Sequence, residues 1–486
     1  MSQNVKQEDA TLDHVLKYTG VFGGVQGIKI LMDVVRNKLA SKFLGAAGIG
    51  MMGLYIAYSD FVNSSSNLGI PISSVQHLSE LFEEGDERRI ASFIRVVRTW
   101  CLWASLLAIV LCVIIAIFRE GHMVLLAPMV VGVIIMGGEI SLLKGLRRLK
   151  RVATISLLAA IATFLLTVPF FWAMGTRGII LSLDCCSLAI MVIHFCFTLP
   201  LYPWRVSPFS RQVFRDGLPL LRIGIPYVLT GMAGSGMAVV LWDFLKEHSS
   251  EELLGYYRAG YTIMVTYAGI VFTALESDYF PRLSSVNHDA TRRNQTINRQ
   301  IRACMLLLSP MLIALIVLMP LLLNLLYTEE FLPAAGMAVC AVFYMFFRCL
   351  SVPIAYTALA RGDSKIYMVM EVIYDVFSLA AIIGCYLLWG LNGIGVGLSL
   401  SALFDVLLVG LSYRRLYAFR LERSTWRHTI EQMLLLGAAV AACLLLPPVW
   451  KYVAGACLFL LSGACGYVIL ARESDIVQRL LQKLHK

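Results

Sequence analysis

The sequence predicts an all-α polytopic membrane protein with about fourteen transmembrane helices. Of its 486 residues, 58% are hydrophobic and only 15% are charged, and the mean hydropathy is +0.75. A soluble domain usually carries about 25% charged residues, and even a 300-residue domain buries only about 75% of its surface. This composition therefore indicates a chain solvated by lipid, and it excludes a secreted, fibrous or disordered protein.

The spans follow from hydropathy, because a helix needs about 20 largely apolar residues to cross about 30 Å of hydrocarbon. Runs of that length recur along the whole chain. The candidate spans are 15–35, 46–70, 93–118, 122–143, 152–173, 177–199, 217–243, 254–275, 302–326, 333–360, 366–389, 392–413, 430–449 and 451–470.

A polar, proline-rich stretch at 200–216 predicts a cytoplasmic linker between two six-helix lobes. The remaining boundaries follow from the spans. We expect an N-terminal lobe over 1–199, a C-terminal lobe over 217–418, an accessory helix pair over 428–471 and a cytoplasmic amphipathic tail over 472–486.

The basic residues predict the orientation. With the N-terminus in the cytoplasm, most of the 41 Lys and Arg residues fall in cytoplasmic loops, as the positive-inside rule requires. An even number of spans then places both termini in the cytoplasm. Residues 75–90 and 476–486 each carry Leu or Ile on one face, which predicts two helices lying on the membrane surface.

Several classes of chemistry find no support in the sequence. The 12 Cys form no CxxC pair and the 8 His show no ligand spacing, so we expect neither disulfides nor a metal site. Gly48-Ile-Gly-Met-Met-Gly53 fits GxGxxG but lacks a preceding strand, and no P-loop is present. No basic run resembles a nucleic-acid footprint. The exterior loops are short, so we expect no catalytic residues and no cofactor.

Four stretches carry a family resemblance. They are Ile28 to Gly50, Leu143-Lys-Gly145 after the fourth span, Tyr279-Phe-Pro-Arg-Leu-Ser284 after the eighth, and Ala360 to Glu371 entering the eleventh. Their order and placement resemble the O-antigen and common-antigen lipid-linked oligosaccharide translocases of the multidrug/oligosaccharidyl-lipid/polysaccharide exporter superfamily. The resemblance covers about residues 1–420.

The resemblance implies a flippase of a bacterial inner membrane. It would carry an undecaprenyl-pyrophosphate-linked oligosaccharide, such as an O-antigen repeat unit, from the cytoplasmic to the periplasmic leaflet. Family members work by alternating access between two six-helix lobes around a cationic cavity. Polysaccharide polymerase and chain-length machinery are the protein partners that this pathway implies.

Charged residues inside spans are the candidate site, because each costs at least about 2.5–3.5 kcal/mol at the bilayer centre unless it faces a cavity or a partner. In the first span, Gln26, Lys29, Asp33 and Arg36 share one helical face. We expect Lys29 and Arg36 to bind pyrophosphate, and Gln26 and Asp33 to line the cavity. Alternatively, Lys29 and Asp33 neutralise each other, which leaves Arg36 without a local acid, or Arg36 only anchors the outer end of the span.

Two further arginines complete the predicted phosphate site. Arg258 follows Tyr257 and precedes Tyr261, and the flat rings of these tyrosines suit sugars and prenyl chains. The other interpretation is an interfacial aromatic belt. Arg348 lies among aromatic residues of the tenth span. It serves either as a phosphate ligand in the cavity or as one half of a buried ion pair with an acid on a neighbouring helix.

The acids Glu371 and Asp375 lie one turn apart in the eleventh span, and Asp60 heads a polar stripe in the second. Two close carboxylates raise each other's proton affinity, which suits coupling to H⁺ or Na⁺. Glu371 and Asp375 would equally serve to pair with Arg348. The single acids Glu139, Asp184, Asp243 and Asp405 are expected to bond neighbouring helices or to cap helix ends.

Two other functions remain open from the sequence. One is a small-molecule or drug-cation antiporter of the same fold, for which the cavity would be anionic. The other is a membrane glycosyltransferase or polymerase, which usually displays its catalytic groups on larger outer loops than this chain has.

Overall fold

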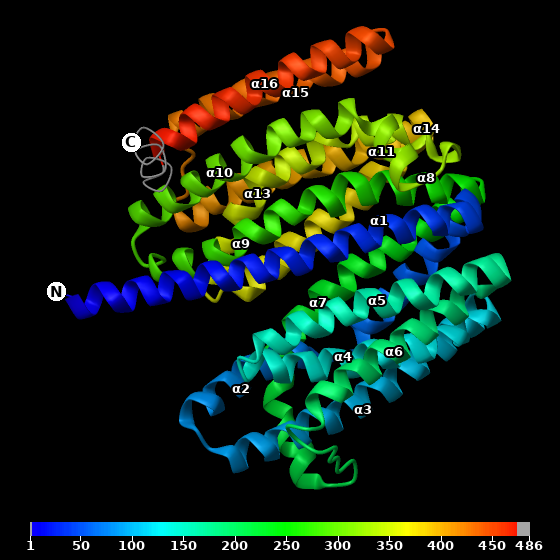
Figure 1. Cartoon of the computed structure of the whole chain (residues 1–486), viewed down its shortest axis with the longest axis vertical. Coiled ribbons are helices and arrows are strands. Elements are labelled where there is room, and N and C mark those ends of the chain that lie inside the picture. Colours follow the sequence, from blue (N-terminus) through cyan, green and yellow to red (C-terminus); the bar gives the residue numbers. More distant parts are fainter. Residues whose placement is uncertain (1, 474–486) are drawn as a thin grey trace. The chain divides into compact units, whose positions relative to one another are not determined.

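The structure, a computed structural model, describes the backbone of residues 2–473 (Figure 1). Side chains are described from Gly27 onward, except at 223, 267, 270, 271, 273–278, 470, 472 and 473. Helices account for nearly all of this part of the chain, and it contains no β-strand. The all-α class predicted from composition is therefore confirmed.

Contacts divide the chain into two compact units, Met1–Val239 and Val240–Lys486. This boundary falls inside α7 (Arg211–His248), whereas the sequence placed the end of the first lobe before the linker at 200–216. The difference has a local cause. The linker and the first part of α7 both pack on unit 1, where the indole of Trp100 faces Gly217 and Val213 of α7.

Unit 1 contains six further α-helices and two short helical turns. Their bounds are α1 (Ser2–Ser66), α2 (Ile70–Glu84), α3 (Glu87–Phe118), η1 (Gly121–Leu126), α4 (Ala127–Gly145), α5 (Leu149–Met174), η2 (Gly175–Gly178) and α6 (Ile179–Thr198). The helix α1 is two helices joined at Gly45, whose φ of 66° reverses the chain direction.

The helix α2 is packed into unit 1 and does not lie free on a membrane surface, which corrects the interfacial helix expected at 75–90. Leu78 is fully buried and Leu81 is 7% exposed, and both belong to the core of unit 1. The Ser74 hydroxyl lies 2.8 Å from that of Ser141 on α4. The predicted periodicity is present: Leu78 and Leu81 on the apolar face are covered by protein, whereas Phe82 is 36% exposed.

The break between α1 and α2 depends on two glycines in contact. Gly69 has a φ of 69°, and its Cα has no room for a side chain because the backbone of Gly224 on α7 lies against it. The Asn67 carboxamide oxygen accepts the Gly69 N–H at 2.8 Å, which satisfies one backbone donor at this break. Glycine is therefore required at position 69 for two reasons, conformation and space.

We expect Gly69→Ala to lower the thermal unfolding temperature more than Gly85→Ala does. Both glycines have positive φ, which costs an L-residue about 1–2 kcal/mol. Only Gly69 also faces a backbone, since nothing lies within 4 Å of a Cβ built at Gly85. Thermal unfolding of both variants in detergent measures the difference. Equal shifts would show that the contact with Gly224 contributes nothing.

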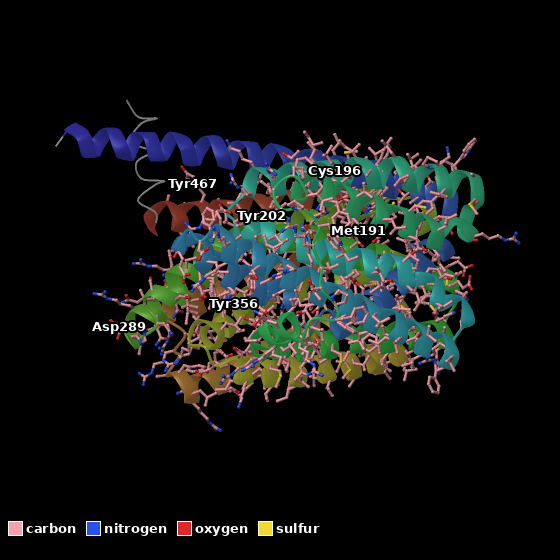
Figure 2. All side chains as sticks on the ribbon, turned by 90° about the horizontal axis from the view of Figure 1, so that it is seen from below. Met191, Cys196, Tyr202, Asp289, Tyr356 and Tyr467 are labelled. Atoms are coloured by element: carbon pink, nitrogen blue, oxygen red, sulfur yellow. The ribbon has the colours of Figure 1, made fainter. Side chains whose placement is uncertain are left out.

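Unit 2 continues from the end of α7. Its helices are α8 (Glu251–Tyr261), the π-helical turn η3 (Thr262–Tyr267), α9 (Ala268–Ser285), α10 (Ala290–Val317), α11 (Met319–Leu326), η4 (Glu329–Phe331), α12 (Ala334–Cys340), α13 (Val342–Ala360), α14 (Ser364–Tyr417), α15 (Arg423–Leu445) and α16 (Pro448–Glu473). The N-cap of α10 is Asp289, labelled in Figure 2 at one end of the helices.

The accessory pair predicted over 428–471 corresponds to α15 and α16, which run side by side and pack on α10 (Figure 1). Gly455 and Gly466 of α16 face Val317 and Leu306 of α10, so the helices approach closely where side chains are absent. The predicted amphipathic helix at 476–486 lies outside the described residues.

Within the described residues, ten helical segments are long and apolar enough to cross a membrane. Three of them exceed one crossing: Gly27–Ser66 turns at Gly45, Leu149–Thr198 includes η2, and Ser364–Tyr417 turns at Gly390. These turns, together with the segment from α8 to α9, make the structure consistent with the predicted fourteen spans.

Candidate functional site

Arg348 of α13 forms an ion pair inside unit 2. Its guanidinium lies 3.1 Å from a carboxylate oxygen of Asp405 on the second half of α14. It also lies 5.5 Å from the ring centre of Tyr374. The Asp405 side chain is 8% exposed and that of Arg348 is 26% exposed. This is the arrangement that the sequence left open as the alternative to a phosphate ligand.

Two more carboxylates surround this ion pair. Glu371 and Asp375, on the first half of α14, lie within electrostatic range of the Arg348 guanidinium. We call Arg348, Asp405, Glu371 and Asp375 the acidic network. It holds one cation among three carboxyl groups, so it offers little attraction for a pyrophosphate in this state.

Arg258 of α8 has a different environment. It is partly exposed, and no acidic side chain in the described part of the chain lies within ion-pair distance of it. Beside it, the rings of Tyr257 and Tyr261 are 5.8 Å apart, and the ring of Trp242 is 5.0 Å from that of Tyr257. The rings of Tyr257 and Trp242 are buried, at 6% and 5% exposed, so this aromatic wall backs the site. The partly exposed Arg258 and Tyr261 are the groups that can meet a phosphate and the face of a sugar ring.

The π-helical turn η3 (Thr262–Tyr267) follows directly after this wall. Such turns are rare and occur frequently at functional sites. No signal in the sequence identified the turn or the position of Trp242 beside Tyr257.

In unit 1, Asp33 pairs with Arg36 at 3.2 Å, and each side chain is 30% exposed. This corrects the alternative in which Asp33 neutralises Lys29 and leaves Arg36 without an acid. Lys29 is the residue without an acidic partner within the described residues. The side chain of Gln26 lies outside the described residues.

The turn at Gly45 also bears on the depth of Arg36. Arg36 lies nine residues before this turn, or about 13 Å along a helix. The expectation that Arg36 binds pyrophosphate, and the alternative that it anchors the outer end of the span, both stay predictions. Asp60, exposed on the second half of α1, is engaged by neighbouring groups.

The acids expected to join helices do so at three positions. Asp405 binds Arg348 as described, and Asp184 of α6 accepts the Met129 N–H at the start of α4 at 2.9 Å. Glu139 of α4 binds Arg98 of α3 through two hydrogen bonds of 2.7 and 2.9 Å. These predictions are confirmed.

Arg98 also fastens the linker that follows α6. The Nη1 atom of Arg98 donates hydrogen bonds to the carbonyl oxygens of Tyr202 and Pro203, at 3.0 and 2.9 Å. The ring of Trp204 lies 5.1 Å from its guanidinium carbon. The hydroxyl of Tyr202, a residue labelled in Figure 2, donates a hydrogen bond to the Glu87 carboxylate at 2.8 Å. The linker at 199–210 is thus part of unit 1. Tyr202 lies outside the spans, and burial together with Glu87 raises its pKa to about 12.

No group of three or more His, Cys, Asp or Glu in the described part of the chain is arranged to hold a metal ion. All 12 cysteines are free thiols.

Comparison with known proteins decides the family. The model of a family described as polysaccharide biosynthesis protein matches residues 39–336. The chain belongs to this family. A second model, for the lipid II flippase MurJ, matches residues 244–462. A comparison with curated proteins found no match.

Solved structures show the same fold. A lipid II flippase MurJ in an inward closed conformation has a TM-score of 0.70 at 15% identity, over 92% of this chain and 99% of that one. An inward-facing MATE family transporter of the MOP superfamily has a TM-score of 0.64 at 14% identity, over 80% and 94%. A MOP superfamily transporter from Pyrococcus furiosus has a TM-score of 0.52 at 14% identity, over 81% and 93%.

These matches confirm the resemblance inferred from the sequence. The chain, a member of the polysaccharide biosynthesis family, has the fold of the solved MurJ and MATE structures, and its apolar helical segments indicate a multi-pass membrane protein.

Proposed function

We propose that the protein is a flippase for a lipid-linked oligosaccharide, with an undecaprenyl-pyrophosphate-linked repeat unit of a surface polysaccharide such as O-antigen as its cargo. In this proposal the membrane is a bacterial inner membrane, both termini are cytoplasmic and the glycan moves to the periplasmic leaflet. Polysaccharide polymerase and chain-length proteins would act on the delivered glycan. The family match and the flippase fold support this proposal.

The observation that carries the proposal is Arg258 beside Tyr257 and Tyr261. A guanidinium without an acidic partner keeps its donors available for phosphate oxygens, which it binds through charge-assisted hydrogen bonds. The ring of Tyr261 is partly exposed and packs beside that of Tyr257, so it supplies an apolar face for a sugar or a prenyl chain. Lys29 in unit 1 is a second cation that has no acidic partner within the described residues.

The other two predicted phosphate ligands already have acidic partners. Arg36 and Arg348 are each bound to an aspartate, so a phosphate would have to displace a carboxylate to reach them. We therefore assign first contact with pyrophosphate to Lys29 and Arg258. Arg36 and Arg348 take part only in states in which their ion pairs open.

The membrane potential is a sufficient driving force in this proposal. An inside-negative potential favours the outward movement of negative charge by about 2.3 kcal/mol per charge per 100 mV. A pyrophosphate head with roughly two negative charges gains about 4–5 kcal/mol per 100 mV. Coupling to H⁺ or Na⁺ through Asp60, Glu371 or Asp375 is then an addition and not a requirement.

The test is flipping of lipid-linked oligosaccharide in proteoliposomes, scored by glycan accessibility on each side. We expect Arg258→Ala and Lys29→Ala each to slow flipping at least about tenfold, because a hydrogen bond to a charged group contributes about 1.5–3 kcal/mol. Arg211→Ala and Lys42→Ala remove exposed cations elsewhere and should leave the rate unchanged. Unaltered flipping in both site variants would remove these residues from the mechanism.

A drug-cation antiporter is the second candidate, and the acidic network favours it. Three carboxyl groups around Arg348 suit a cation better than they suit a pyrophosphate. Uptake of a cationic dye driven by a proton or sodium gradient measures this function. Gradient-driven dye uptake that Glu371→Gln abolishes, in a protein that flips no lipid-linked glycan, would replace the flippase by the antiporter.

A further inference from the structure

A cavity of about 660 Å³ lies in unit 2, between α13, the second half of α14 and the start of α15. Its size is within the range of small-ligand pockets, about 300–1,000 Å³. Apolar side chains form one part of its lining, including Leu350, Ile354 and Val406. Arg414, Arg420 and Arg423 form the other part, and all three are exposed.

The charge of this pocket is not compensated by the protein around it. No acidic side chain within the described residues forms an ion pair with Arg414, Arg420 or Arg423. The single acid of the loop at 418–422 is Glu422, and it is bound to Arg302 at 2.8 Å. Three arginines without an acidic partner among the described residues therefore line one cavity, and their donors are available for an anion.

The pocket lies on the outer side of these helices and not on the side of the acidic network. At about 100° per residue, Leu350 and Ile354 point about 200° and 240° away from Arg348 along α13. Arg414 points about 180° away from Asp405 along α14. Leu411 and Trp426 at the rim are 62% and 55% exposed, as expected of residues that contact lipid.

The position along the helices adds a second constraint. The arginines lie at the end of α14 and the start of α15, where basic loops predict the cytoplasmic surface. The apolar residues continue from there along α13 and α14, the direction in which an acyl chain would extend. Basic pockets between transmembrane helices on this side are suited to anionic lipid headgroups.

We propose that this pocket binds an anionic phospholipid of the cytoplasmic leaflet. Its phosphate lies against Arg414, Arg420 and Arg423, and one acyl chain follows the exposed Leu411 and Trp426 over the apolar floor of the cavity. This lipid is a resident of the bilayer and not the transported cargo, because the pocket and the acidic network occupy opposite faces of the same helices. The inference goes beyond the proposed flippase activity and does not depend on it.

Gly410 provides a way to close the pocket without changing its charge. It lines the cavity, and a Cβ built on it meets nothing within 4 Å. Gly410→Leu therefore fills the cavity with an apolar side chain. It also replaces glycine by a better helix former, so the fold is expected to be retained.

The experiment is native mass spectrometry of the full-length protein in detergent with added phosphatidylglycerol or phosphatidylcholine of the same acyl chains. We expect the wild type to retain phosphatidylglycerol in preference to phosphatidylcholine. The triple variant Arg414→Gln, Arg420→Gln, Arg423→Gln should bind it on the order of a hundredfold more weakly, since each basic residue near an anionic surface contributes about one kcal/mol. Gly410→Leu should lose binding as well.

A matched variant controls for net charge. Lys144→Gln, Arg148→Gln, Arg415→Gln removes three exposed charges from loops of the same predicted side, outside the cavity, and should bind as the wild type does. If Gly410→Leu still bound phosphatidylglycerol, or if the control variant lost binding as the triple variant does, surface electrostatics would explain the effect. Either result would overturn the proposed lipid pocket.

Two competitors distinguish the sources of phosphate. Inorganic pyrophosphate should not displace phosphatidylglycerol, because it lacks the acyl chain; displacement would make this an ion site. Undecaprenyl pyrophosphate should compete no better than phosphatidylglycerol, and much tighter binding would assign the pocket to the cargo. Equal retention of both phospholipids by the wild type would also overturn the proposal.

Discussion

Replacing Arg348 by glutamine is expected to destabilise the protein by about 3 kcal/mol and to stop flipping as a consequence. The substitution leaves Asp405, 8% exposed, without its counter-ion and close to Glu371. Breaking a buried ion pair typically costs about 3–5 kcal/mol, and we take the lower end because Arg348 is 26% exposed. Thermal unfolding in detergent measures this loss.

The double variant Arg348→Gln, Asp405→Asn separates structure from transport. Two neutral side chains of similar shape remove the unpaired charge, so we expect both stability and flipping to return to near the wild-type values. A double variant that is stable but does not flip would make Arg348 a ligand of the cargo after all. Arg361→Gln is the control, because its ion pair with Asp363 is 40% exposed on both sides and should contribute less than about 1 kcal/mol.

Replacing Arg98 by alanine is expected to have the largest effect on stability. Arg98 and Glu139 are each 2% exposed, and the guanidinium makes two bonds to the carboxylate and two to linker carbonyls. Its loss leaves the buried Glu139 carboxylate without its counter-ion and frees two partly buried linker carbonyl oxygens, for a cost of about 3–5 kcal/mol. Arg89→Ala, whose ion pair with Glu84 is largely exposed, should change stability by less than about 1 kcal/mol.

The same residue also connects stability to the linker. We expect limited proteolysis to cut the segment at 199–210 faster in Arg98→Ala than in the wild type, because its anchoring hydrogen bonds are gone. The apolar double variant Arg98→Met, Glu139→Leu should recover stability but keep the faster cleavage. Cleavage at the wild-type rate in both variants would show that Arg98 does not hold the linker.

The sequence by itself determined the membrane class, the approximate spans and the family. These follow from properties of contiguous segments: hydropathy over about 20 residues, basic loops and short motifs in order. It also placed charged residues on common helical faces, such as Lys29 with Asp33 and Glu371 with Asp375, because helical periodicity is a local property.

Only the tertiary structure decided which charges are paired. Arg348 and Asp405 are 57 residues apart, and Arg98 and Glu139 are 41 residues apart, so no local pattern connects them. Asp33 had two basic neighbours within helical reach, and side-chain packing selected Arg36 over Lys29. The apolar face of α2 predicted a helix on the membrane surface, whereas in the structure this helix packs against α4. Hydropathy and periodicity depend on neighbours along the chain, whereas charge compensation and cavities depend on neighbours in space.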